Sequence, residues 1–217
     1  MGGDLQRATA DVTDWHPYAH GAQRASVAWL AVLGVGAAWA WGAGTRGLGW
    51  TPPWWLDTPA VFGFYGILYW VFNVYLWQLS LVARLHGIPD LSGQYQVTIR
   101  TSHDMHVTQR IGKATIAQSW SSLIVRVELD TSTSRSRGAW LVLSPGVGTT
   151  LTYVYDNAPK PTAGQGLNQH EGTAVMTFTS DRRGSGSYYT GRGRTSFGEI
   201  TFEPAELERP ASETSGS

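Results

Sequence analysis

Two long apolar segments without a charged side chain constrain the fold of this chain more than any other feature. The first covers residues 26–44 (SVAWLAVLGVGAAWAWGAG) and the second residues 61–83 (VFGFYGILYWVFNVYLWQLSLVA). Each is close to the roughly 20 residues that a helix needs to cross the hydrocarbon core of a membrane. The stretch between them is rich in proline and tryptophan, as expected for a short loop at a membrane interface. The sequence predicts a two-helix transmembrane hairpin within residues 26–86, after a leader of residues 1–25.

A cleaved signal peptide is the alternative for the first segment. Arg24 precedes the segment, and Ala38-Trp39-Ala40 resembles a small-residue cleavage site. However, the segment follows a long polar leader, contains bulky tryptophans and is followed directly by a second apolar segment. These three features favour the hairpin.

Arginines on either side of the hairpin indicate its orientation. Arg7 and Arg24 precede it and Arg84 follows it, whereas Arg46 lies in the loop. Because positive residues accumulate on the cytoplasmic side, both chain termini are expected in the cytoplasm of a multi-pass membrane protein.

Three residues within the predicted spans are candidates for helix association. Asn73 lies near the middle of the second span, where an unpaired amide is costly, so we expect it to bond another helix. That helix is either the other helix of the hairpin or one from a second protomer. Gly34 and Gly36 in the first span would permit close approach of a neighbouring helix.

After the Gly- and Pro-containing segment HGIPD at residues 86–90, which breaks regular structure, the hydrophobic pattern changes from helical runs to alternation. Short alternating segments bounded by Gly, Ser, Asp or Pro predict strands, and about eight of them predict an all-β antiparallel barrel or sandwich over residues 87–203. Residues 204–217 are polar and lack aromatic side chains, so we expect a disordered tail. The candidate strands are 93–101, 105–111, 114–120, 123–129, 139–143, 150–155, 172–179, 186–192 and 197–202.

Composition and motif searches exclude several classes of function. The 16 basic and 16 acidic side chains balance, which disfavours binding to long DNA or RNA. The chain has no cysteine, so disulfides, thiolate catalysis and sulfur-ligated zinc are excluded. It contains no Walker A loop, GxSxG or HExxH motif. His103 and His106 could ligate a metal, but they fall at a predicted turn, which favours solvated side chains.

Alternation also places polar and aromatic side chains on common faces. Tyr153 and Tyr155 share one face of their strand, which we expect Asp156–Pro159 to end, and Tyr188, Thr190 and Arg192 share one face of another. Aromatic rings can stack on bases and arginine matches phosphate, so this combination suits a nucleotide. The other interpretation is that the tyrosines belong to the core and Arg192 faces solvent.

Several local marks resemble the membrane-anchored β-barrel effectors of bacterial CBASS anti-phage systems, which join two transmembrane helices to a cyclic dinucleotide receptor barrel. No single mark is diagnostic, but their order and the preceding hairpin make the combination fairly specific. The marks are Leu91-Ser92-Gly93, residues 116–120 (IAQSW) with the following strand, Ser132, Ser134 and Ser136, residues 151–159 (LTYVYDNAP), His170-Glu171-Gly172-Thr173 and residues 186–192 (GSYYTGR).

The resemblance implies a receptor for a cyclic dinucleotide made by a partner nucleotidyltransferase of the cGAS/DncV-like class. It further implies that ligand binding drives oligomerisation and disruption of the inner membrane, without enzymatic activity, metal or other cofactor. A barrel of about eight strands is wide enough to hold one small ligand. The expected ligand-binding residues are Trp120, Arg126, Ser134, Tyr153, Tyr155, Asn157, His170, Thr190 and Arg192, with Arg192 as the phosphate ligand and Arg126 as a second basic candidate facing either the lumen or solvent.

Two alternative functions remain from the sequence. A membrane-tethered barrel hydrolase would use His170 and Glu171 as acid and base, although a nucleophile or metal set is missing. A lipocalin-like carrier would have a mostly apolar lumen, and the aligned Tyr, Thr and Arg side chains argue mildly against it.

Overall fold

The structure is a computed structural model that describes residues 20–50, 54–102, 105, 107–144, 148–161, 168–191 and 196–205. It contains two compact units. The helical unit comprises the chain up to Asp90 together with Gln118–Ser122, and the barrel unit comprises Leu91–Ala117 and the chain from Leu123 onward. Most of the predicted leader, nearly all of the predicted tail, His103, His106 and Arg192 lie outside the described residues.

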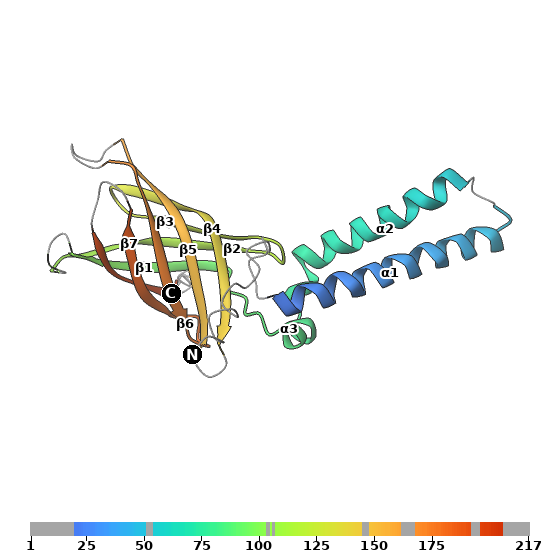
Figure 1. Ribbon diagram of the computed structural model, residues 1–217, viewed down its shortest axis with the longest axis horizontal. Coiled ribbons are helices and arrows are strands. Elements are labelled where there is room, and N and C mark those ends of the chain that lie inside the picture. Colours follow the sequence, from blue (N-terminus) through green and yellow to red (C-terminus); the bar gives the residue numbers. More distant parts are fainter. Residues whose placement is uncertain are drawn as a thin grey trace, which may run out of the picture. The chain divides into compact units, whose positions relative to one another are not determined.

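Two long helices, α1 (His20–Gly47) and α2 (Trp54–Val74), run side by side in the helical unit (Figure 1). Within the described residues, one helical stretch, Ala28–Gly47, is long and apolar enough to cross a membrane. The apolar stretch of α2 among the described residues, Phe62–Val74, is shorter than a membrane span. The structure thus supports one predicted span by length and composition and leaves the two-span hairpin as a proposal.

Gly34 is the point of close approach between α1 and α2. A Cβ atom at Gly34 would lie 3.3 Å from the Cα and Cβ atoms of Tyr65. Nothing lies within 4 Å of the corresponding position at Gly36. Of the two glycines predicted to permit close approach, Gly34 therefore does so between these two helices.

The second predicted span, residues 61–83, has the wrong boundaries. The helix begins earlier, at Trp54, and ends at Val74, after which come a 3₁₀ turn, η2 (Leu76–Gln78), and the short helix α3 (Ser80–His86). The Asn73 carbonyl oxygen accepts a hydrogen bond from the backbone N–H of Trp120 at 3.1 Å. In a continuing helix this oxygen would accept from Trp77, four residues later. The helix therefore ends where the Asn73 carbonyl oxygen bonds the turn at residues 118–122 in place of the next helical turn.

The Asn73 side chain also bonds this turn, whereas we expected it to bond a helix, either the other one of the hairpin or one from a second protomer. Its Oδ1 atom accepts from the backbone N–H of Ser121 at 2.8 Å. Beside it, the Trp120 ring packs between Phe72 and His86, with centroid distances of 5.2 and 5.3 Å. Asn73 thus satisfies backbone donors in a turn within the helical unit.

The predicted barrel is confirmed: eight strands in sequence order form a closed barrel (Figure 1). Antiparallel pairing of the first strand with the last closes the sheet. Closure removes the exposed strand edges that an open sheet would present. The strands are β1 (Gly93–Thr101), β2 (Gln109–Gln118), β3 (Leu123–Glu128), β4 (Ser132–Ser144), β5 (Gly148–Pro159), β6 (His170–Phe178), β7 (Gly184–Thr190) and β8 (Phe197–Pro204).

Two of the predicted strands, 105–111 and 114–120, are a single strand, β2. We expected Gly112 and Lys113 to separate them, but Gly112 lies within the strand and pairs with Val97. A Cβ atom at Gly112 would collide with the Glu128 backbone oxygen. The glycine permits close approach of neighbouring backbone and does not mark a turn.

Two other strands are longer than predicted. β4 begins at Ser132 and not at residue 139. Nothing in the sequence indicated this earlier start, because Ser132–Arg137 contains only small and charged side chains and no apolar period. β5 continues to Pro159, whereas we expected Asp156–Pro159 to break it. Asn157 lies opposite both Ser134 and His170 in the sheet, so it is a strand residue and does not form a turn.

Apolar side chains fill the half of the barrel nearest the start of β1. Val97, Leu151, Met176 and Phe202 are fully buried there. At the end of this half, the Tyr95 hydroxyl donates to the Leu91 carbonyl oxygen at 2.6 Å, and the Arg182 guanidinium donates to the Ser92 carbonyl oxygen and the Tyr95 hydroxyl. This packed half leaves the other end of the barrel for a cavity.

Candidate functional site

A cavity opens in the barrel at the ends where β1, β3, β5 and β7 finish and β2, β4, β6 and β8 begin. The space between its walls, including solvent at its open mouth, measures about 730 Å³. All its described lining residues belong to the barrel unit. They are Ile99, Thr101, Arg110, Val127, Leu129, Thr131, Ser132, Ser134, Tyr153, Tyr155, Asn157, His170, Tyr188, Thr190, Ser196 and Ile200.

Polar side chains from several strands form the rim of this cavity. The Ser134 hydroxyl donates to Asn157 Oδ1 at 2.9 Å across β4 and β5. On β7, the Thr190 hydroxyl donates to the Ser196 carbonyl oxygen and accepts from the Ser196 backbone N–H, both at 3.0 Å. These bonds hold hydroxyl and amide groups at the mouth, where they can exchange partners with a polar ligand.

Below the rim, three tyrosines provide an aromatic layer. The rings of Tyr153 and Tyr155 are adjacent on β5, with centroids 5.9 Å apart. Burial raises the pKa of Tyr153 above its ordinary value, and the neighbouring Tyr155 adds to the shift. The Tyr153 hydroxyl therefore stays protonated and is available as a donor. Tyr188 lines the cavity from β7.

Glycines on the neighbouring strands make room for these rings. A Cβ atom at Gly172 on β6 would collide with the Tyr155 ring, and one at Gly198 on β8 would lie 2.8 Å from the Tyr188 ring. Because β-branched or aromatic residues ordinarily occupy inward positions of small barrels, two glycines here create space that side chains would otherwise fill.

Arg110 is a cavity residue that sequence reasoning missed. It lies at the start of β2 and lines the cavity mouth, and its side chain is exposed. Within the described part of the chain it has no ion pair. The signal was available in the alternation of β2: Arg110 has the same parity as Ala114 and Ile116, which are buried. Because we predicted a break at Gly112, we did not assign Arg110 to the same strand as Ala114 and Ile116.

Six of the predicted ligand-binding residues line the cavity together: Ser134, Tyr153, Tyr155, Asn157, His170 and Thr190. Trp120 does not, because it lies in the turn that belongs to the helical unit. Arg126 lies on the outer face of β3, where its Nε atom pairs with Glu128 at 2.7 Å. Arg192 is outside the described residues, so its predicted role as phosphate ligand stays a prediction.

The arrangement disfavours the hydrolase alternative. His170 lines the cavity, whereas Glu171 is exposed and pairs with Arg137 on the outer face. Successive strand residues face opposite sides of a sheet, so these two side chains cannot act on one substrate within the lumen. No cluster of three or more metal-ligating side chains occurs in the part of the chain that the structure describes.

Comparisons with known proteins agree with this geometry. The family described as "Cap15, cyclic dinucleotide receptor domain" matches residues 86–204, a range that includes every strand of the barrel. The chain is also similar to the CD-NTase-associated protein 15 of Yersinia aleksiciae, with 32% identity over 145 residues. That alignment covers 66% of this chain and 69% of the relative.

Proposed function

Because this chain belongs to the family of Cap15 cyclic dinucleotide receptor domains, we propose that it binds its cyclic dinucleotide in the barrel cavity and acts as a membrane effector of anti-phage defence, without catalysing a reaction. The observation that carries the binding site is the layered cavity, in which a polar rim with Arg110 lies above three tyrosines. In this proposal a partner nucleotidyltransferase supplies the ligand.

The layers suggest how the ligand lies. The phosphates bind at the mouth, where the Arg110 guanidinium and the hydroxyls of Ser134 and Thr190 donate hydrogen bonds, together with Arg192. The bases reach down to Tyr155 and Tyr188, whose rings can stack on them for about 1–3 kcal/mol per base. Few charges suffice for a small anion in a lumen of low dielectric, so the balanced net charge of the chain is no objection.

Thermal unfolding of the full chain in detergent tests this binding. We expect one member of a panel of cyclic di-AMP, cyclic di-GMP, cyclic GMP–AMP and cyclic UMP–AMP to stabilise the chain by about 2.7 kcal/mol at a hundredfold excess over its Kd. The corresponding linear dinucleotides are the control, since they carry the same bases. A panel that leaves the melting temperature unchanged throughout contradicts the receptor site.

For the effector activity that follows ligand binding, we propose that α1 and α2 lie in the inner membrane, with the barrel and both termini in the cytoplasm. On ligand binding the chains would oligomerise and disrupt the bilayer. The support comes from α1, where Trp29, Val32, Leu33 and Val35 expose more than half of their surface. Such apolar side chains require lipid or another helix to cover them. Gly36, which has no neighbour between α1 and α2, is available for contact with a second copy.

Val35→Lys is expected to abolish both membrane association and ligand-dependent growth arrest. Val35 is exposed near the middle of the stretch Ala28–Gly47, and a lysine at the centre of a spanning helix costs about 2.5–3.5 kcal/mol. Cell fractionation and growth after co-expression of the cyclase measure the two effects, with Val35→Leu as the apolar control. Full growth arrest by a variant found in the soluble fraction would exclude membrane disruption as the mechanism.

A further inference from the structure

A bulge in β4 lies behind the cavity rim. The pairing of β4 with β5 is regular up to Ser136 opposite Tyr155 and resumes with Gly138 opposite Val154, so Arg137 is the extra residue. The Ser136 hydroxyl accepts a hydrogen bond from the Val125 backbone N–H at 2.9 Å and thereby bonds the neighbouring strand. Bulges characteristically redirect a side chain, and here the redirected side chain is that of Arg137.

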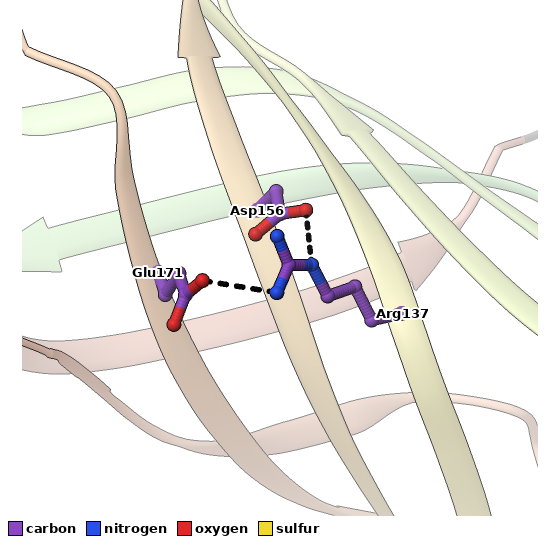
Figure 2. Close-up of polar contacts among 3 residues, drawn as sticks. All are labelled: Arg137, Asp156 and Glu171. Carbon is purple, nitrogen blue, oxygen red and sulfur yellow. Dashed lines mark hydrogen bonds and ion pairs between the residues drawn. The ribbon is translucent and has the colours of Figure 1, made fainter.

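Arg137 reaches two carboxylates on the outer face of the barrel (Figure 2). Its Nε atom lies 2.5 Å from Asp156 Oδ2, and its Nη1 atom lies 3.0 Å from Glu171 Oε1. Asp156 on β5 and Glu171 on β6 are direct cross-strand neighbours. Like charges in directly opposed positions of a sheet destabilise the pairing, so the guanidinium between them removes a repulsion.

The next cross-strand pair along these strands faces the cavity. Asn157 lies opposite His170, and Ser134 of β4 lies opposite Asn157 and donates a hydrogen bond to it. The outer row of Arg137, Asp156 and Glu171 and the inner row of Ser134, Asn157 and His170 therefore belong to the same short section of three strands. A change in the pairing of the outer row would displace the inner row.

We propose that Arg137 is a positioning residue for ligand binding: by bridging Asp156 and Glu171 outside the barrel, it holds β5 and β6 together where Asn157 and His170 face the ligand. This role rests on the proposed binding site. Arg137 acts through the strands, and it is the bulge that brings its guanidinium over both carboxylates.

An exposed ion-pair network of this kind contributes little to global stability, since water and salt screen it. Its expected effect is local, at the end of β5 and the start of β6, where Asn157 and His170 form the last pair of the two strands. Loss of Arg137 should consequently weaken ligand binding while leaving the melting temperature of the unliganded chain nearly unchanged.

The experiment compares three variants of the full chain in detergent, with the tightest-binding member of the cyclic dinucleotide panel as probe. Arg137→Ala should raise the Kd about fivefold. Arg183→Ala is the matched control, because the exposed Arg183 side chain pairs with Asp181, away from the section of β4, β5 and β6 that Arg137 bridges. Arg137→Ala combined with Asp156→Asn and Glu171→Gln should restore the Kd, because the repulsion is gone.

Other outcomes overturn the proposal. An unchanged Kd for Arg137→Ala shows that the bridge is dispensable, and a failure of the triple variant to recover shows that Arg137 acts on the ligand through its own charge. Equal weakening by Arg183→Ala shows a general charge effect. Hydrogen exchange of the unliganded chain gives an independent measure: Arg137→Ala should speed exchange of the amides at residues 170–173, and the triple variant should slow it again. If no probe binds wild type, the proposed function fails while this exchange result still decides the role of Arg137.

Discussion

Arg110→Ala is expected to raise the Kd for the cyclic dinucleotide about thirtyfold. Arg110 is the basic side chain among the described residues of the cavity lining, and it lies at the mouth, where the phosphates are proposed to bind. A hydrogen bond to a charged group contributes about 1.5–3 kcal/mol, and about 2 kcal/mol corresponds to the stated factor. Isothermal titration calorimetry of the full chain in detergent measures the change.

Arg100→Ala provides the matched control for Arg110. Arg100 lies on β1, the strand that pairs with the Arg110 strand β2. Its side chain is exposed on the outer face of the barrel, opposite Gln109. Its loss should leave the Kd within about twofold, as is usual for surface substitutions. A similar loss of affinity in both variants would indicate general electrostatic attraction, and wild-type affinity in Arg110→Ala would remove Arg110 from the site.

Gly172→Ala is expected to lower the melting temperature and to weaken ligand binding at least tenfold. Gly172 is buried, and an added Cβ atom would collide with the Tyr155 ring and lie 2.7 Å from the Tyr189 backbone oxygen. Overpacking of this kind typically costs about 1–3 kcal/mol of stability. The Tyr155 ring can only move away from β6, which brings it into the cavity and out of the position proposed for base stacking.

Gly138→Ala is the control for this substitution. Gly138 also lies in a barrel strand, but nothing is found within 4 Å of its added Cβ atom. Thermal unfolding and ligand titration should therefore show near-wild-type behaviour for Gly138→Ala and a combined loss for Gly172→Ala. Normal stability and affinity in Gly172→Ala would show that Tyr155 has space elsewhere and does not define the cavity.

Much of the fold followed from local patterns in the sequence. The uncharged run within α1, the Gly/Pro boundary near residue 87 and the alternation of strands such as β1, β3 and β6 each reflect a short-range periodicity. The same periodicity placed Tyr153 and Tyr155 on one face and Tyr188 and Thr190 on another, and all four line the cavity. Alternation was sufficient because it specifies which side chains share a face, whatever the partner strand.

Long-range contacts explain the predictions that were wrong. The end of α2 at Val74 depends on the backbone N–H of Trp120, which is remote in sequence from Asn73. Gly112 resembles a turn residue in the sequence, yet its position is determined by the Glu128 backbone. The polar start of β4 and the continuation of β5 to Pro159 depend on pairing with each other, and cross-strand hydrogen bonds leave no periodic apolar signal.

By itself, the sequence determined that an apolar helical segment precedes an alternating β domain in which tyrosines and hydroxyls share strand faces. Only the tertiary structure decided which polar residues meet: Arg110 at the cavity mouth, Trp120 in the helical unit, Arg126 outside the barrel and Arg137 over two carboxylates. The physical reason is that periodicity is a property of one strand, whereas a site depends on strand register, bulges and ring closure. Those are set by hydrogen bonds and packing between segments far apart in the chain.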